Sequence, residues 1–302
     1  MKVCVGVLAY NSENTILETL DSILMQTYGP EHVELVVSDD ASSDGTVSVV
    51  RKWVEVHECR FFKIKVLEQK FNSGVSANFN RLINHADSIW IKPIAADDIL
   101  MPECLADNTS FINSNIDCKI LFSNAIRFEK YKHSNNKKLV CDKRFFNQNA
   151  AVQSEMLLTQ CNILAPTSFI SMDLLKTVGG ADERFPMIED YPLWLKITRF
   201  GVKLYANDAF SVYYRSGESL SRAHTTIGNE RYVIDSQRFH QQIIWPSVSL
   251  IKRLDDRVMF YAKLTAIRIF GNRKSFAYYI FFLCTFLFRP YRILKKIRGF
   301  FR

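Results

Sequence analysis

The sequence VELVVSDDASSDGT, residues 33–46, joins a short apolar run directly to an acidic turn. Most of the side chains in VELVV are apolar, which is typical of a strand buried on both faces of a parallel sheet. The polar residues from Asp39 to Thr46 can cap a following helix, which we expect to continue to about Val56. A buried strand that leads through a polar turn into a helix is the repeating unit of an α/β fold.

The same unit recurs on both sides of this segment. Short apolar runs predict three further strands, at residues 2–8, 62–67 and 88–94. Between them, Asn11 and Ser12 can cap one helix, and the turn Asn72-Ser73-Gly74 leads into another at about residues 77–85. This alternation predicts a mostly parallel central sheet with helices on both faces.

Two later regions depart from the alternating pattern. Residues 128–149 are polar and rich in Lys and Asn, and we expect a surface loop or a mobile lid there. Helix-like and strand-like pieces resume between residues 152 and 214, and from about Gly217 we expect a helical C-terminal extension.

Composition narrows the class of protein. The chain has 302 residues, of which 48% are hydrophobic and 23% charged, so it can bury a core and is not a disordered chain. Its seven cysteines are scattered without CxxC spacing, which predicts reduced thiols in a cytosolic setting. The Met1 end has no basic-then-apolar signal segment, and we expect no export by a cleaved signal peptide.

The net charge of +8 belongs to the end of the chain. After Asp256 there are 11 Lys and Arg and no acid, so the first 256 residues together carry a net charge of −3. Because the main part of the chain is not basic, we expect no nucleic-acid partner.

Two pairs of adjacent aspartates follow predicted strands. Asp39-Asp40 and Asp97-Asp98 should meet at one edge of the sheet, where ligands bind beyond the carboxyl ends of parallel strands. Adjacent carboxylates repel each other unless a cation or hydrogen-bond donors compensate. A single pair could merely cap the next helix, but two such pairs favour a ligand site.

Five segments resemble the family 2 glycosyltransferases, which have the GT-A fold. In the family's order and approximate spacing they read VGVLAYNSENTILETLDSILMQTY, VELVVSDDASSDGT, FNSGVSANFNRLINHA, IKPIAADDILMP and MIEDYPLWLKITRFG. The resemblance implies a GT-A domain over residues 1–215, with its nucleotide-sugar-binding part at 1–127 and its acceptor part at 128–215. Residues 216–302 form the extension.

The resemblance implies a nucleotide site at the end of the first strand and the acidic turn. Ala9, Tyr10 and Asn11 would line the base and ribose. Asp39 would accept a hydrogen bond from the uracil imide of a UDP-sugar, whereas Asp40 would support the loop and its helix cap.

Three other residues are implied near the sugar-nucleotide. Asn72 and Gly74 open a turn beside it, although an Asn-Ser-Gly turn needs no ligand, and both interpretations stay open. Arg215 ends a predicted strand and could reach the diphosphate.

The pair Asp97-Asp98 resembles the metal-binding motif of the fold. Asp97 would contact the ribose, and Asp98 would coordinate Mg²⁺ or Mn²⁺, cations that prefer hard carboxylate oxygens. Ala95 stands where many relatives carry an aspartate, so metal binding would depend chiefly on Asp98. The metal-binding histidine of many relatives is also missing; His224 is the nearest histidine and is expected to be a surface residue.

A third acid pair, Glu189-Asp190, precedes an amphipathic helix. Acids at this position stabilise the helix dipole, so capping alone could explain them. The resemblance implies a catalytic base here, and inverting transfer needs a base that removes the proton from the acceptor hydroxyl. We favour Asp190 over Glu189 for this role, and both residues can also cap the helix.

The basic tail contains an apolar run, residues 276–288, between Lys274 and Arg289. It is too short to span a bilayer, and the following RPYRILKKIRGFFR suits a segment lying on an anionic membrane surface. The alternative is a helix that packs on the domain with its lysines in solvent.

The resemblance implies an inverting hexosyltransferase that uses a UDP-sugar, and the basic tail favours a lipid-diphosphate-linked sugar acceptor. Such enzymes build surface polysaccharide, O-antigen or capsule, and we expect this one in the cytoplasm, peripheral on the inner face of the cell membrane. The alternatives are a sugar-phosphate nucleotidyltransferase and a non-catalytic, membrane-peripheral binding protein of the same fold. The first should open with a Gly-rich, Lys/Arg-containing loop, which LAYNSEN is not.

Overall fold

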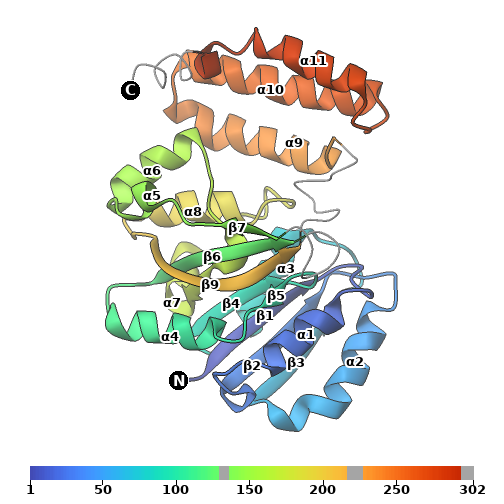
Figure 1. Ribbon diagram of the computed structural model, residues 1–302, viewed down its shortest axis with the longest axis vertical. Helices are drawn as coiled ribbons and strands as arrows, with labels where there is room; N and C mark the ends of the chain where they lie inside the picture. The colour runs from blue at the N-terminus through green and yellow to red at the C-terminus, as the bar shows by residue number, and fades with distance from the viewer. Residues whose placement is uncertain (129–135, 216–226, 294–302) are drawn as a thin grey trace. The chain divides into compact units, whose positions relative to one another are not determined.

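The computed structural model describes residues 1–128, 136–215 and 227–293 (Figure 1). The chain divides into two compact units, Met1–Arg215 and Ser216–Arg302.

The first unit is built on one mixed sheet with the strand order β3-β2-β1-β4-β8-β6-β9-β5, to which β7 is added beside β6. The strands are β1 (Val3–Ala9), β2 (Val33–Asp39), β3 (Lys63–Glu68), β4 (Trp90–Ala95), β5 (Ile99–Leu100), β6 (Ile120–Phe128), β7 (Lys137–Leu139), β8 (Phe169–Ser171) and β9 (Tyr205–Arg215). Strands β3, β2, β1 and β4 are mutually parallel, whereas β8 runs antiparallel between β4 and β6. The expected mostly parallel α/β sheet is confirmed.

Helices of the first unit connect the strands. They are α1 (Ile16–Leu24), α2 (Thr46–His57), α3 (Val75–His85), α4 (Cys104–Ser114), α5 (Lys143–Phe146), α6 (Ala150–Thr159), α7 (Met172–Val178) and α8 (Asp190–Arg199).

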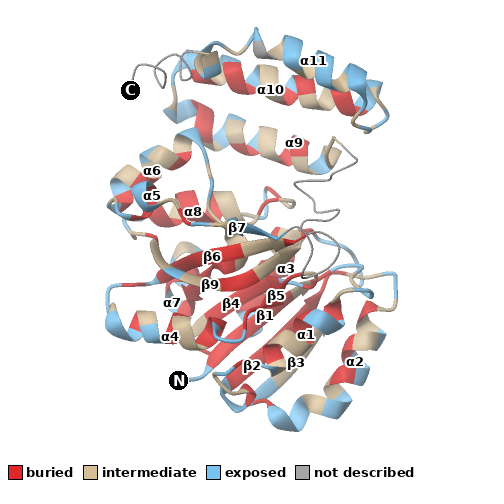
Figure 2. Cartoon of the chain, viewed as in Figure 1, coloured by how far each residue is buried: buried red, intermediate tan, exposed pale blue. Residues whose placement is uncertain are grey.

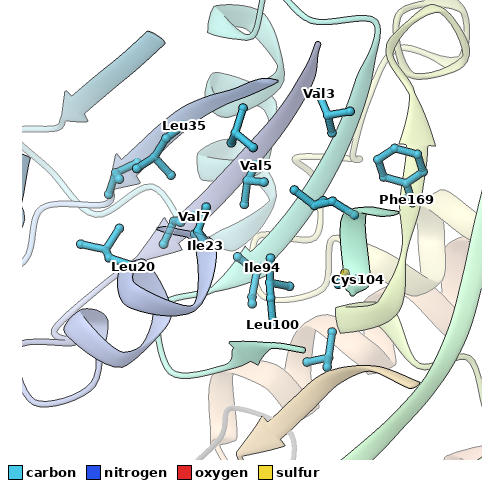
Figure 3. Packing of buried hydrophobic residues seen from close by; sticks show 14 of the residues in the cluster. Val3, Val5, Val7, Leu20, Ile23, Leu35, Ile94, Leu100, Cys104 and Phe169 are labelled. Carbon is cyan, nitrogen blue, oxygen red and sulfur yellow. The ribbon is translucent and has the colours of Figure 1, made fainter. Parts of the chain in front are cut away.

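The core explains why these helices lie on both faces of the sheet. Val3, Val5 and Val7 alternate along β1 and pack in one cluster with Leu20 and Ile23 of α1 (Figure 3). The opposite face of β1 receives α3, and the buried strands stand out in Figure 2. Gly6 permits this approach, because a Cβ at that position would collide with Leu82 of α3.

Two local expectations are wrong. Helix α1 begins at Ile16, and neither Asn11 nor Ser12 caps it with a side chain; Thr15 holds the N-cap position. The segment 128–149 is not simply a surface loop, because β7 and α5 form within it and α5 buries Phe145 and Phe146. Residues 129–135 of that segment lie outside the described residues.

The second unit is helical, as expected. Its described residues form α9 (Glu230–Phe239), α10 (Leu250–Ile269) and α11 (Phe276–Phe286), with a π-helical turn (His240–Ile244) and a 3-10 turn (Trp245–Ser247) between α9 and α10. Across 1–128, 136–215 and 227–293, no helix combines the length and the apolar character needed to cross a membrane. All seven cysteines lie in these ranges and are free thiols, consistent with the expected reduced state.

Candidate active site

Both aspartate pairs lie next to the carboxyl end of β1. Ala9 at this end is in register with Asp39 of β2, and Leu8 is in register with Ala95 of β4. The carbonyl of Ala9 accepts a hydrogen bond from the N–H of Asp40 (2.9 Å), and that of Leu8 accepts one from Ala96 (3.0 Å). The sheet therefore brings the two acidic loops together, as parallel strands require.

Asp39 is buried and is held by Ser42. One carboxylate oxygen accepts from the Ser42 N–H (2.8 Å) and the other from the Ser42 hydroxyl (2.5 Å). Each carboxylate oxygen has a second lone pair, so Asp39 can still accept a hydrogen bond from a ligand.

The residues after β1 are open to solvent. Tyr10 is 51% exposed, which leaves its ring available for stacking. Asn11 adopts a left-handed conformation (φ 48°), and its side chain accepts a hydrogen bond from the N–H of Ser43 at 2.8 Å. Asn11 therefore fixes the acidic turn against the end of β1, a contact that the sequence analysis missed.

Asp40 joins the acidic turn to the next loop. Its carboxylate accepts hydrogen bonds from the N–H groups of Ser73 (3.0 Å) and Gly74 (2.9 Å) and from the Ser73 hydroxyl (2.7 Å). The predicted loop support is present, but Asp40 does not cap α2. The N-cap position of α2 is Gly45, and Asp44 just before it accepts from the Thr46 N–H at 3.0 Å.

Arg81 of α3 contacts this loop, and the sequence analysis did not identify it as a site residue. Its guanidinium lies 3.2 Å from the Asp40 carboxylate and donates to the Asp39 carbonyl (3.3 Å) and to Asn78 (3.0 Å). Because both Arg81 and Asp40 are largely buried, this ion pair is a fixed part of the floor of the site. The only signal in the sequence was its helical position seven residues after Gly74.

The turn Asn72-Ser73-Gly74 contacts protein groups on both sides. Asn72 donates to the Asp40 carbonyl at 3.2 Å. Gly74 has a φ of 88°, and a Cβ there would lie 2.7 Å from the carbonyl oxygen of Pro186. Ser76 donates through its hydroxyl to the carbonyl of Phe185 (2.7 Å). The turn thus links the acidic loop to the segment that leads into Glu189 and Asp190.

The Asp97-Asp98 loop is held by α1 and by β9. Thr15 donates to the Ala96 carbonyl (2.9 Å), and Thr19 donates to the Asp98 carbonyl (2.7 Å). Arg215, at the end of β9, donates its N–H to one carboxylate oxygen of Asp98 at 2.8 Å.

The side chain of Arg215 is already engaged within the protein. It donates to the Asp97 carbonyl (2.9 Å) and to Glu18 (2.5 Å), and its guanidinium lies over the ring of Phe128 at 4.7 Å. To reach a diphosphate, Arg215 must exchange at least one of these contacts.

Asp98 is a deeply buried carboxylate. It is only 1% exposed, and its burial raises its pKa well above the usual value, an effect to which the charge of Asp97 adds. Burial also raises the pKa of Asp97. A divalent ion would relieve both costs, because it favours the ionised carboxylates.

The donor set at this loop suits a hard cation but is small. Asp98 has one carboxylate oxygen committed to the Arg215 N–H, and Ala95 supplies no ligand. Within the described parts of the chain, no three or more His, Cys, Asp or Glu side chains gather as a metal cluster. His224 lies outside the described residues. A cation here would need phosphate or water oxygens to complete its shell.

A lysine lies buried behind Asp98. Lys92 of β4 is fully buried, and it donates to the carbonyls of Pro93 (3.2 Å) and Pro166. Burial lowers its pKa to about 8, although the nearby charge of Asp98 opposes this shift. Lys92 therefore ties β4 to the segment at Pro166, within residues 128–215, which the resemblance assigns to the acceptor.

Glu189 and Asp190 begin α8. Glu189 occupies the N-cap position without a side-chain capping bond, and Asp190 accepts from the N–H of Tyr191 at 2.7 Å. Burial, together with the charge of Asp190, raises the pKa of Glu189 to about 8. The pKa of Asp190 is also raised by burial. Because the charge of Asp190 helps to raise the pKa of Glu189, Asp190 is the member of the pair that ionises first.

A cavity of about 310 Å³ lies elsewhere in the first unit. It is lined by residues that include Cys141, Phe146 and Asp208, and it contains none of the predicted site residues.

These features define a glycosyltransferase of the GT-A fold. The sequence profile described as Glycosyl transferase family 2 matches residues 4–167, more than half of the chain, and the protein belongs to that family. It is therefore an enzyme of glycosyl transfer, and neither alternative raised from the sequence is retained.

Two curated bacterial proteins show the relationship. EpsE of Bacillus subtilis is 29% identical over 130 residues, which cover 43% of this chain and 45% of EpsE, less than half its length. WfaP of Escherichia coli, a UDP-Glc:α-D-GlcNAc-diphosphoundecaprenol β-1,3-glucosyltransferase, is 26% identical over 215 residues, which cover 70% of this chain and 76% of WfaP.

Solved structures share the fold. TarS of Staphylococcus aureus in complex with UDP-GlcNAc has a TM-score of 0.60 at 21% identity, over 87% of this chain and 72% of that one. The mannosyltransferase PcManGT of Pyrobaculum calidifontis, in complex with GDP-Man and Mn²⁺, has a TM-score of 0.55 at 21% identity, over 88% and 64%.

Proposed function

We propose that this protein is an inverting hexosyltransferase that uses a UDP-sugar and a lipid-diphosphate-linked sugar acceptor in the synthesis of surface polysaccharide, O-antigen or capsule. The proposal rests on one observation: in a chain of this family, Asp39-Asp40 and Asp97-Asp98 both lie next to the carboxyl end of β1. The name of WfaP specifies UDP-glucose and a diphosphoundecaprenol-linked acceptor, and TarS was solved with UDP-GlcNAc.

The nucleotide is assigned to the end of β1. Ala9, Tyr10 and Asn11 would border the base and ribose, and the free lone pairs of Asp39 would accept from the uracil imide. Asp40 keeps a supporting role, because its donors all come from the protein. Asn72 and Gly74 would border the donor through their backbone, since the Asn72 side chain is bonded to Asp40.

The diphosphate is assigned to the Asp97-Asp98 loop. Asp97 would contact the ribose, and Asp98 would hold Mg²⁺ or Mn²⁺. When bound, such a cation neutralises charge on the departing diphosphate. Arg215 supplies a second positive charge beside the same loop, and exchange of its contact with Glu18 would free it to meet a phosphate oxygen.

The acceptor hydroxyl is assigned to Asp190. A proton on Glu189 leaves Asp190 as the anion of the pair, and the Tyr191 N–H stabilises that charge. Asp190 can then remove the hydroxyl proton as the oxygen attacks the anomeric carbon and the bond to the diphosphate breaks. Glu189 acts by keeping its neighbour charged.

A lipid-linked acceptor would keep the enzyme peripheral on the inner, cytoplasmic face of the cell membrane. The acid-free, basic end of the chain supports this location, because anionic lipids attract basic segments.

The test is a transfer assay with UDP-sugars and a short-chain lipid-diphosphate sugar, comparing wild type with Asp98→Asn and Asp190→Asn. Each variant should lose about 10²–10⁴-fold in kcat/KM, as expected for loss of charge stabilisation or of a base. Asp117→Asn, an exposed acid on the first unit, is the matched control and should retain full activity. Equal activity in all four proteins would refute the assignment.

A further inference from the structure

One face of α11 is apolar and exposed. Phe276, Tyr279, Ile280 and Leu283, together with Leu287 just after the helix, stand at the i, i+3, i+4, i+7 and i+11 positions and so share one side. Their exposed fractions range from 48% for Ile280 to 81% for Phe276. We call these five residues the α11 stripe.

The α11 stripe is presented by a packed helical hairpin. On the other side of α11, the rings of Tyr278 and Phe281 contact Phe270 at the end of α10, at 6.4 and 5.9 Å between centroids. Beyond α11, Arg289 donates to the buried carboxylate of Asp255 in α10 at 2.9 Å. Because α11 already uses its inner face, the stripe is not needed to form this unit.

The exposed charged residues that flank the stripe in the sequence are basic. The acids nearest to it in sequence, Asp255 and Asp256 of α10, are buried and paired with Arg289 and Lys252. No acid follows in the sequence, while Arg273 before α11 and Arg292 after it are exposed. An apolar stripe with basic flanks matches an anionic membrane surface. A second copy of this chain is disfavoured as occupant, because it would bring two basic, acid-free segments together.

We propose that α11 lies in the plane of an anionic membrane, with the α11 stripe facing the acyl chains. This inference rests on the proposed lipid-linked acceptor and names the surface that meets the lipid. At about 1.5 Å per residue, the helix extends for roughly half of the ~30 Å hydrocarbon core, so it lies in the interface and does not cross it.

The experiment is co-sedimentation of the full chain with vesicles, without donor or acceptor. Wild type should bind vesicles that contain phosphatidylglycerol, more weakly at high salt and on pure phosphatidylcholine. Leu283→Glu and Leu283→Ser should each lower binding, the first by about tenfold or more. Ile116→Glu, at an 85% exposed position in the first unit, introduces the same charge and should bind as wild type does.

Two results would overturn the inference. One is the absence of wild-type binding to anionic vesicles. The other is unchanged vesicle binding by Leu283→Glu, with or without a change from dimer to monomer in light scattering; such a change would make the stripe a contact between copies. The transfer assay with a short-chain acceptor is independent of vesicles. Vesicle binding without transfer would refute only the proposed function, and transfer without vesicle binding would refute only this inference.

Discussion

The backbone N–H of Arg215 donates a hydrogen bond to the carboxylate of Asp98 across 2.8 Å, between residues 117 positions apart in the sequence. The pairing of β5 with β9, in which Ile99 is in register with Tyr213, brings these residues together. The end of β9 therefore helps to fix the one carboxylate on which metal binding would chiefly depend.

Replacement of Asp98 by Asn should separate stability from activity. The amide oxygen of Asn can still accept from the Arg215 N–H, while the buried charge is removed. We expect about 0–2 kcal/mol of added stability at pH 7, since burial disfavours the ionised form of Asp98. Chemical denaturation measures this, together with the transfer assay. Asp98→Ala, which leaves the Arg215 N–H without its acceptor, should instead destabilise by about 1–3 kcal/mol.

Glu189→Gln should change the pH dependence of stability. The pKa of Glu189 is about 8 in the folded protein against 4.5 normally, so between these values the native state holds the extra proton. Wild-type stability should therefore fall as pH rises from about 4.5 to 8. Over the same rise in pH, the Gln variant should lose less stability than wild type does. In denaturation curves the difference between the two losses should reach about 1–3 kcal/mol by pH 9. An unchanged slope would contradict the protonated state of Glu189.

The same variant should keep most of its transferase activity at pH 7. A neutral Gln reproduces the protonated Glu189, so Asp190 remains the charged member of the pair. We expect kcat within about tenfold of wild type, against a loss of 10²–10⁴-fold for Asp190→Asn. The reverse ranking would identify Glu189 as the base.

Sequence patterns predicted the parts of the site that depend on neighbouring residues. Buried strands and the acids that follow them are local features, and parallel pairing then places Asp39 and Asp98 at the same edge. The partners of these acids were not predictable in the same way. A carboxylate can accept from any donor that the fold brings near, and for Asp40 these donors come from residues 73, 74 and 81.

The burial of Lys92 was also not predictable from the residues next to it in the sequence. The sequence IKPIAADD gives no sign of its environment: the strand is buried on both faces, and the ammonium is enclosed. Its acceptor at Pro166 lies on a loop 74 residues away. The roles of the site residues toward ligands came from the resemblance, and they stay predictions until they are tested.

Gly74→Ala should destabilise the fold more than an equivalent change elsewhere. Ala at a φ of 88° costs about 1–2 kcal/mol for the left-handed backbone, and its Cβ would also lie 2.7 Å from the Pro186 carbonyl. We expect a total of about 2–4 kcal/mol in denaturation experiments. Gly179→Ala is the control, because its φ is 73° and nothing lies within 4 Å of an added Cβ. Similar losses in both would mean that the contact with Pro186 is unimportant.

Lys92→Met should alter stability at alkaline pH. The pKa of Lys92 is about 8 in the folded protein against 10.5 normally, so between these values the unfolded chain binds the extra proton. Wild-type stability should then gain from this group as pH rises from about 8 to 10.5. Met has a similar length and no charge, so its variant should lack this gain. Below pH 8 the Met variant should be more stable than wild type by about 1–2 kcal/mol, because the cost of a buried charge is removed. The lost hydrogen bonds to the carbonyls of Pro93 and Pro166 reduce this gain.

The exposed Lys52→Met is the control and should leave the pH profile of stability unchanged. If the two variants give parallel profiles between pH 8 and 10, Lys92 is charged in the folded protein throughout that range, and the positive charge behind Asp98 is a permanent part of the site.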